Sequence, residues 1–533
     1  MIISLGIALF LAVISGVVIY RRCSDLERFE RAIGASMPAL AALLGIAVIL
    51  TIRVEPYYDW NDARLARTFA LFHGVPLYLG ADATGPIVGT NHAPVSHFLY
   101  WPAIFAATPI SAIQIASTIS FVLAFGPVIW LHWPGRLVNS RSVLYSTFAL
   151  ITCGYILLRG DIGKDGITYC IFHVHTDAAA IFFATIAGGL ICRTEDRPGW
   201  QRLLLSSLFA VLSLGCKQTM APVLPALCLF LWIGDGFRTA VRYGVCLLGS
   251  GFLVFALLVY RFRPAKDLFF NILTLASHRP YDVPMGRAFV AAVRDKTLEG
   301  LPAIYCLVLF GLYWYFYERD SSLGWRKLFT TQRWLVFPVI GLLLAPVMIK
   351  ARMTIGGDSN HIGTFCFFLS LGATLGLSRF MSDETSQPKA AAARSLAMAM
   401  IAVSLIGVIE TVSYAIFKGN SGQSNVGMAY EYSLKHPGRA YFPRFPLAVF
   451  YAQHRFYHSD GALIDRELAG HPISHAQYAS GIPSNFEVIA LPAGYEESGA
   501  LVEYLKGWTQ LHDSELPGFG VYQRPSTASQ ISQ

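Results

Sequence analysis

The sequence contains few charged residues for its length. Asp, Glu, Lys and Arg make up 14% of the 533 residues, whereas roughly a quarter is usual in soluble domains. Hydrophobic residues make up 54%. This composition excludes an ordinary soluble protein and indicates a membrane protein. The formal net charge is +8, but no nucleic-acid-binding motif accompanies it, so the basic residues first report orientation in the membrane.

Paired cysteines are also lacking. The nine cysteines include no CxxC pair, and most of them fall in apolar runs, as is typical of small core residues. None follows Lys418, so no disulfide framework supports the C-terminal part of the chain.

The N-terminus lacks the positive charge that precedes the apolar core of a signal peptide. Its apolar run starts at Ile2 and is followed by Arg21 and Arg22. We therefore predict a retained first helix whose C-terminal end lies in the cytoplasm.

Long apolar runs recur along the first 417 residues and predict an all-α polytopic membrane bundle of about twelve transmembrane helices. After the first helix they lie near 36–53, 109–131, 142–158, 176–192, 203–216, 219–233, 241–260, 300–317, 334–349, 361–378 and 395–417. Every second loop, starting at Arg21, is basic, so the positive-inside rule gives a consistent topology. It places the DWND motif and everything after Lys418 on the external side.

The predicted topology divides the chain into two domains. Residues 1–417 form the transmembrane domain, with external loops at 54–108, 159–176, 261–299 and 350–361. Residues 418–533 are too polar for a bilayer, and FEVIALP and FGVYQR predict short strands within them. We expect a small external α/β C-terminal domain there.

The first external loop begins VEPYYDWNDARLARTFALFHGVPLY. Asp59 and Asp62 are three residues apart and would share one face of a helix, and Arg64 and Arg67 repeat that spacing. Two acids beside arginines and tyrosines, just outside a membrane, indicate a site. The alternative is an amphipathic helix on the membrane surface with a solvated charged face.

Basic residues on the external side are unexpected, because orientation disfavours them there. The loop at 261–299 nevertheless carries Arg261, Arg263, Lys266, Arg279, Arg287, Arg294 and Lys296. An anionic ligand at the outer membrane surface would favour such residues, since guanidinium groups pair well with phosphate oxygens. A solvated amphipathic loop helix is the alternative.

Three further external segments carry polar residues next to apolar runs. In HVHTD, His173 and His175 suggest a metal site, whereas Asp177 also suits the first turn of a helix. Lys217, in the turn GCKQTMAP, either snorkels or supplies a fixed positive charge to a phosphate. The segment IKARMTIGGDSNH, with Arg352 and Asn360, suits a hydroxylated ligand.

The order of these motifs resembles that of the GT-C superfamily of integral membrane glycosyltransferases, of the protein mannosyltransferase and aminoarabinose transferase type. The segment from DWND to GVPLY is similar to the superfamily's acidic first external loop. The resemblance implies that Asp62, with Asp59 as its partner, is the catalytic carboxylate. It maps Asp177 and Lys217 onto the second-loop Asp and the lysine turn. Two departures are the D-W-N-D spacing and a second helix before the loop.

The resemblance implies an inverting transfer of a hexosyl or pentosyl group from a polyprenyl-phosphate donor to an acceptor hydroxyl. The acceptor would be an envelope lipid, glycan or protein, and the site would face the periplasm or exterior of the plasma membrane. Asp62 or Asp59 would act as general base or hold a divalent metal ion. The expected substrate-binding residues are Asp177, His175, Lys217, Arg352, Arg279 and Asn360, with Arg287 as a further cation.

Two other functions fit the composition. A polytopic transporter or flippase of a lipid-linked or anionic envelope substrate usually carries its binding groups at the midplane, on broken and repeated helices. Here the polar clusters lie at the external ends of the runs, and no half-to-half repeat is visible. A non-catalytic assembly or sensor protein that binds envelope glycans is the other alternative.

Overall fold

The computed structural model describes most of the chain. The described residues are 2–22, 27–89, 91–133, 140–158, 166–193, 197–281, 301–318, 324–355, 357, 360–382, 387–420, 422–482, 485–495 and 497–525. Arg287, Arg294 and Lys296 of the predicted basic loop lie outside these residues.

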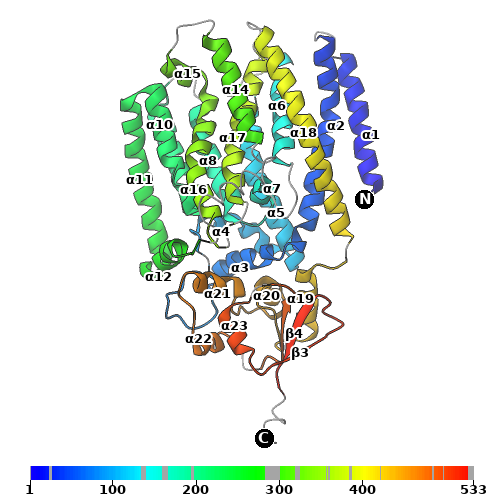
Figure 1. Cartoon of the computed structure of the whole chain (residues 1–533), viewed down its shortest axis with the longest axis vertical. Helices are drawn as coiled ribbons and strands as arrows, with labels where there is room; N and C mark the ends of the chain where they lie inside the picture. The colour runs from blue at the N-terminus through cyan, green and yellow to red at the C-terminus, as the bar shows by residue number, and fades with distance from the viewer. Residues whose placement is uncertain are drawn as a thin grey trace, which may run out of the picture.

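A bundle of long helices makes up the first four fifths of the chain (Figure 1). Its main helices are α1 (Ile2–Arg22), α2 (Arg28–Val54), α5 (Pro109–His132), α6 (Ser140–Leu157), α8 (Thr176–Cys192), α9 (Trp200–Cys216), α10 (Val223–Asp235), α11 (Phe237–Arg261), α14 (Leu301–Glu318), α16 (Val336–Arg352), α17 (Asn360–Met381) and α18 (Gln387–Gly419). Within the described residues, seven helical stretches are long and apolar enough to cross a membrane, and three apolar helices are shorter. The protein is therefore a multi-pass membrane protein.

Every apolar run that the sequence predicts falls on one of these helices. The count of about twelve crossings stays a prediction. The most buried helix is α17, of whose apolar window 78% is buried inside the bundle. Its small residues permit this, because Gly372 and Gly376 let Pro338 and Trp334 approach the helix backbone closely.

Short elements gather at the end of the bundle that faces the C-terminal domain (Figure 1). They are η1 (Glu55–Tyr57), α3 (Trp60–Phe72), α4 (Val95–Leu99), η2 (Trp101–Phe105), α7 (Gly166–Phe172), η3 (Gln218–Met220), α12 (Ala265–Phe269) and η4 (Phe270–Leu275). The short helix α15 (Trp325–Thr331) and η5 (Arg333–Leu335) belong to the opposite end. The described parts of the predicted external loops thus contain several short helices, and Lys350 and Arg352 lie in the last turn of α16 instead of in a loop.

The C-terminal domain is a small mixed sheet with short helices. The strands β1 (Ala440–Tyr441), β2 (Val488–Pro492), β3 (Thr509–Leu511) and β4 (Phe519–Gln523) lie in the order β1-β2-β4-β3. Only β1 and β2 are parallel; the other pairs are antiparallel. The helices are α19 (Asn425–Lys435), α20 (Pro446–Gln453), α21 (Asp460–Leu468), α22 (His475–Ser480) and α23 (Gly499–Tyr504). The two predicted strands correspond to β2 and β4 and are confirmed.

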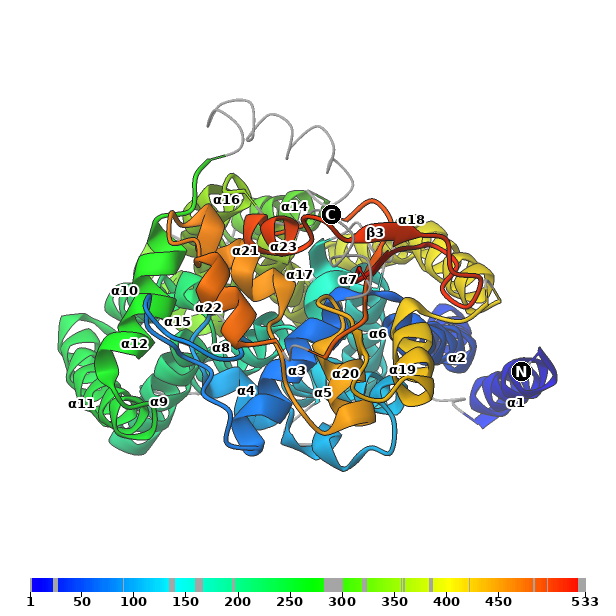
Figure 2. The same ribbon diagram turned by 90° about the horizontal axis from the view of Figure 1, so that it is seen from below.

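The C-terminal domain and α3 share one hydrophobic core. Leu65 and Phe69 of α3 belong to the same buried cluster as Phe445, Leu447 and Phe450 around α20. Figure 2, which looks onto this end of the molecule, shows α20 in front of α3, and the two helices are in contact. Because apolar area is buried across this junction, the domain is held against the bundle over the polar residues of α3.

Candidate functional site

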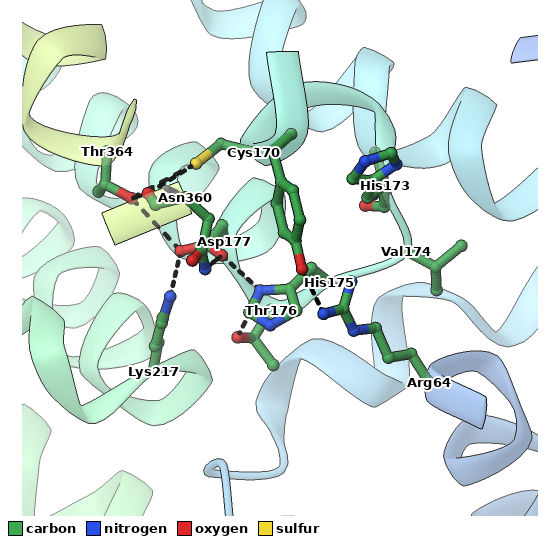
Figure 3. Close-up of polar contacts among 12 residues, drawn as sticks. Arg64, Cys170, His173, Val174, His175, Thr176, Asp177, Lys217, Asn360 and Thr364 are labelled. Atoms are coloured by element: carbon green, nitrogen blue, oxygen red, sulfur yellow. Dashed lines mark hydrogen bonds and ion pairs between the residues drawn. The ribbon is translucent and has the colours of Figure 1, made fainter. Parts of the chain in front are cut away.

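A buried polar cluster forms around Asp177, the second residue of α8 (Figure 3). Its carboxylate accepts hydrogen bonds from Lys217 Nζ at 2.6 Å and from Asn360 Nδ2 at 2.7 Å. The His175 imidazole also contacts it through Nδ1. We call these four residues the Asp177 cluster. Asp177 and Lys217 are 0% and 1% exposed, so the charges neutralise each other in a place where an unpaired charge would be costly.

The local sequence explains why the cluster forms. Asp177 lies in the first turn of α8, where the helix dipole favours a carboxylate. Lys217 follows the end of α9 and Asn360 begins α17, so helix ends from three parts of the chain meet at one carboxylate. Burial lowers the pKa of His175 to about 3, although the nearby negative charge of Asp177 acts to raise it. The imidazole is therefore neutral and donates its Nδ1 hydrogen to Asp177.

Asp62 lies in the first turn of α3 and is fully buried. Its two oxygens accept hydrogen bonds from the backbone N–H groups of Leu447, at 2.9 Å, and Ala448, at 3.0 Å. These N–H groups belong to the first turn of α20, which has no partners for them within the helix. Asp62 thus caps a helix of the C-terminal domain and fixes that domain to α3.

Asp59 precedes α3 and has different surroundings. Its Oδ2 accepts a hydrogen bond of 3.0 Å from Asn425 Nδ2, at the start of α19. Its Oδ1 is buried without a hydrogen-bond partner among the described residues. Burial raises the pKa of Asp59, while hydrogen bonds from Asn425 and Tyr495 and the charge of Arg444 act against the increase. A carboxylate with a raised pKa and an open oxygen suits proton acceptance.

Arg444, from the segment before α20, covers the same region. Its guanidinium carbon lies 4.6 Å from the ring centre of Trp60 and 4.7 Å from that of Tyr495. The Nε and Nη1 atoms are buried and have no hydrogen-bond partner among the described residues. The cation next to Asp59 therefore has donors available for a polar ligand.

The sequence-based predictions did not include a third carboxylate near α3, that of Glu55. Glu55 Oε2 lies 2.6 Å from His173 Nδ1 and accepts a 2.7 Å hydrogen bond from Asn61. The Tyr58 ring stacks on His173 with 4.0 Å between ring centres. Glu55 stands in the same segment as Asp59, but its burial against His173 depends on a contact 118 residues away along the chain. No local spacing signals it.

Two arginines of α3 line a small pocket together with neutral histidines. We call it the arginine pocket; its lining residues are Arg64, Arg67, His92, Ser96, His97, Tyr100, Val174, His175 and Thr176. Burial, followed by the charges of Arg67 and His175, lowers the pKa of His97 to about 3. Burial lowers the pKa of Arg67 to about 10; Asp465 opposes this, whereas Arg64 adds to it. Like charges that repel each other in a buried place favour an anionic ligand.

The arginine pocket is connected to the Asp177 cluster and, through neighbouring side chains, to Asp59. Its residue His175 belongs to the Asp177 cluster. Its residue Arg64 contacts the hydroxyl of Tyr169, which lies 3.3 Å from the hydroxyl of Tyr58, next to Asp59. The guanidinium of Arg64 also lies 5.8 Å from the ring centre of Trp60. An anion in the pocket would therefore lie within a few side chains of Asp59.

The remaining predicted residues are not all in one place. Asp177, His175, Lys217 and Asn360 are together in the Asp177 cluster. Arg279 forms an ion pair with Asp465 of α21, and Arg352 is exposed and donates to the Gly357 carbonyl at 2.6 Å. Arg64 and Arg67, which the sequence distinguished only by spacing, line the arginine pocket, whereas the cations that act on Asp59 are Arg444 and Lys418.

No group of three or more His, Cys, Asp or Glu suited to a metal ion occurs in the described part of the chain. Both oxygens of Asp62 are occupied by backbone N–H groups, and His173 and His175 face different carboxylates. The predicted metal ion therefore has at most Asp59 as a ligand in this arrangement, and we assign no step to it.

No protein-family model matches the sequence, and no curated protein matches it in sequence. The structure is similar over most of the chain to AglB, an archaeal oligosaccharyltransferase from Archaeoglobus fulgidus, in complex with an inhibitory peptide and a dolichol-phosphate. That match has a TM-score of 0.45 and 12% identity and covers 91% of this chain and 74% of that one. The arabinosyltransferase EmbB from Mycobacterium smegmatis matches with a TM-score of 0.37 and 12% identity, covering 73% of this chain and 43% of that one.

Since both TM-scores are below 0.5 and both identities are 12%, these similarities say nothing about the activity, the donor or the acceptor of this chain.

Proposed function

We propose that this protein is a membrane glycosyltransferase that moves a sugar from a polyprenyl-phosphate donor to an acceptor hydroxyl at the external face of the membrane. The observation that carries the proposal is the arginine pocket. Arg67, which is buried, Arg64, which is partly buried, and three neutral histidines lie within a few side chains of Asp59, a carboxylate with a raised pKa. They do so at the end of the bundle that the C-terminal domain covers, where a donor with its tail in the bilayer has access.

In the proposed reaction, the bond between the anomeric carbon and the phosphate oxygen breaks, and the phosphate leaves with the electron pair. Arg64 and Arg67 stabilise the charge that develops on the phosphate, since fixed cations in a place shielded from water act strongly on such charge. His97, which is neutral and whose Nε2 has no hydrogen-bond partner among the described residues, contributes an N–H donor to the same oxygens, whereas the single N–H of neutral His175 is donated to Asp177. A phosphate leaving group needs little protonation, so no separate acid is required.

Asp59 is the proposed general base. Its open Oδ1 accepts the proton of the acceptor hydroxyl while the acceptor oxygen bonds to the anomeric carbon, which inverts the configuration there. Asp62, the residue that the resemblance favours, is instead proposed as a positioning residue, because both of its oxygens hold α20. Arg444, with unpartnered donors beside Asp59, is placed to orient the acceptor.

The Asp177 cluster is proposed to position His175 in the pocket. Lys217 is neutralised by its 2.6 Å contact with Asp177, so it orders the cluster and does not face the phosphate as a free charge. Arg279 adds positive potential near Arg67. For Arg352 and Asn360 we retain substrate binding as a prediction from the sequence.

The proposal is tested with the purified protein in lipid nanodiscs and a panel of radiolabelled polyprenyl-phosphate hexoses and pentoses. We expect release of polyprenyl phosphate from one donor, and loss of at least about 100-fold in rate in Asp59→Asn, as is typical when a general base is removed. Asp82→Asn, an exposed carboxylate of the same external loop, is the control and should keep the wild-type rate. Parallel reactions with a chelator test the predicted metal ion.

Two results would contradict this assignment. Full activity in Asp59→Asn would show that Asp59 is not the general base. Movement of an intact donor across the bilayer without cleavage would favour the transporter alternative.

A further inference from the structure

A second polar concavity lies at the end of the bundle opposite the C-terminal domain, where Figure 1 shows α15 and the end of α10. Its volume is about 600 Å3, within the range of about 300–1,000 Å3 that is usual for small-ligand sites. It is lined by Arg197, Gly234, Asp235, Gly324, Arg326, Lys327, Thr330 and Arg333. We call it the basic concavity. It has no residue in common with the arginine pocket.

The charges of the basic concavity are unbalanced. Arg333 donates to both oxygens of Asp235, at 2.7 and 2.8 Å, and the two side chains are buried, so this pair is neutral. Arg197, Arg326 and Lys327 remain, and all three are exposed. Among the described residues that line the concavity, Asp235 is the only carboxylate. Three cations around one hollow repel each other unless an anion lies between them.

Exposed tryptophans indicate the level of the basic concavity relative to the lipid headgroups. Trp200, Trp232 and Trp325 are 55%, 56% and 55% exposed, and each stands within three residues of a lining residue. Tryptophan gathers at the level of the lipid headgroups, where its ring meets apolar chains and its N–H meets water. The three cations are therefore at headgroup depth on a membrane-facing part of the bundle.

We propose that the basic concavity binds the phosphate headgroup of an anionic phospholipid from the leaflet at that end of the bundle. The positive-inside rule explains basic residues on this side, but not their collection around one hollow, with exposed tryptophans close to its lining residues in the sequence. Basic pockets between transmembrane helices on the cytoplasmic side suit lipid headgroups such as that of cardiolipin. Guanidinium donors of Arg197 and Arg326 pair with phosphate oxygens, and Lys327 adds a point charge. This proposal does not depend on the glycosyltransferase assignment.

The test measures lipid retention by native mass spectrometry after the protein is released from nanodiscs of phosphatidylcholine containing cardiolipin. The double variant Arg197→Gln/Lys327→Gln removes two exposed cations of the concavity. The matched control, Arg21→Gln/Arg22→Gln, removes two exposed cations of α1 at the same predicted side. We expect the concavity variant to lose about tenfold in cardiolipin occupancy, and the control to keep the wild-type value.

A conservative variant and a soluble anion complete the test. Arg197→Lys/Lys327→Arg keeps the charge and should retain the lipid, which separates loss of binding from misfolding. Equal loss in both Gln variants would show a diffuse surface charge and overturn the proposal. If inorganic phosphate raises Tm in detergent as much as cardiolipin does at the same concentration, the ligand is a soluble anion and the lipid assignment is wrong.

Discussion

Asp59 and Asp62 are three residues apart, yet they contact different parts of the C-terminal domain. Asp62 faces the first turn of α20 and has both oxygens occupied. Asp59 faces Asn425 and keeps one oxygen open. The difference arises because α3 begins at Trp60: Asp62 projects from a helix toward buried backbone, whereas Asp59 lies before it. Asp59 is thus available for the proposed proton transfer, whereas Asp62 holds the C-terminal domain.

The pH dependence of the reaction follows from the raised pKa of Asp59. A base acts in its ionised form, so activity should fall as the pH drops through a pKa that lies above the ordinary 3.8 of this carboxyl. Because the charge of Arg444 lowers that pKa, Arg444→Gln should move the acid limb to higher pH. The measurement is kcat/KM for donor turnover against pH, with Tm recorded for each variant. An acid limb at or below 3.8, unchanged in Arg444→Gln, would contradict the role of Asp59.

At the scale of single residues, the sequence predicted the members of the Asp177 cluster but not their roles. Asp177, His175, Lys217 and Asn360 were recognisable because each stands where an apolar run begins or ends. Glu55 was not, because its significance comes from burial against His173, and Arg67 was distinguished only by its spacing from Arg64. Which of Asp59 and Asp62 is free to act as the base depends on the contact of Asp62 with α20, which is about 385 residues further along the chain.

At the scale of elements, the site is held by helix ends. The ends of α8, α9 and α17 meet at Asp177, and the start of α20 meets α3 at Asp62. The long helices were predictable because a bilayer imposes a minimum apolar length. Strands β2 and β4 were predictable from their apolar and aromatic residues, but β1 has two residues and β3 is exposed throughout. Neither carries a pattern that a sequence reveals.

The ion pair between α8 and the end of α9 should act as a unit. Lys217→Met leaves the Asp177 charge buried without its cation, which typically costs about 3–5 kcal/mol. In Lys217→Met/Asp177→Asn the charge is also removed, so most of the lost stability should return. The free energy of unfolding in denaturing detergent measures both. As a control, Glu515→Gln breaks the exposed ion pair with Lys435 and should change the free energy of unfolding little. Additive losses in Lys217→Met/Asp177→Asn would show that Lys217 and Asp177 are not coupled.

The capping of α20 by Asp62 predicts a specific local change. Asp62→Ala removes two charge-assisted hydrogen bonds and leaves buried N–H groups unpaired, at a cost of about 3 kcal/mol. The amides of Leu447 and Ala448 should then exchange hydrogen faster, with Asp62→Asn intermediate because it keeps one acceptor. Hydrogen exchange with mass spectrometry resolves α20, and Asp82→Asn serves as the control. Unchanged exchange in α20 would show that Asp62 does not hold the domain.

At the scale of the whole molecule, the two ends of the bundle differ in chemistry. The end covered by the C-terminal domain carries buried carboxylates, the arginine pocket and the Asp177 cluster. The other end carries the exposed cations of the basic concavity, with exposed tryptophans near them in the sequence. A donor and an anionic phospholipid would therefore meet the protein in opposite leaflets. Both proposals depend on which end faces the cytoplasm, and that orientation rests on the distribution of Lys and Arg along the sequence.

Orientation can be measured with single cysteines at the two ends. Ser514→Cys lies in an exposed turn of the C-terminal domain, and Arg238→Cys lies exposed in the first turn of α11. A membrane-impermeant maleimide should label Ser514→Cys in intact cells, and Arg238→Cys only after the membrane is opened. The wild-type protein gives the background, since the native cysteines of the described residues are buried or partly buried. The reverse pattern would place the arginine pocket in the cytoplasmic leaflet, where a donor presented from outside cannot reach it.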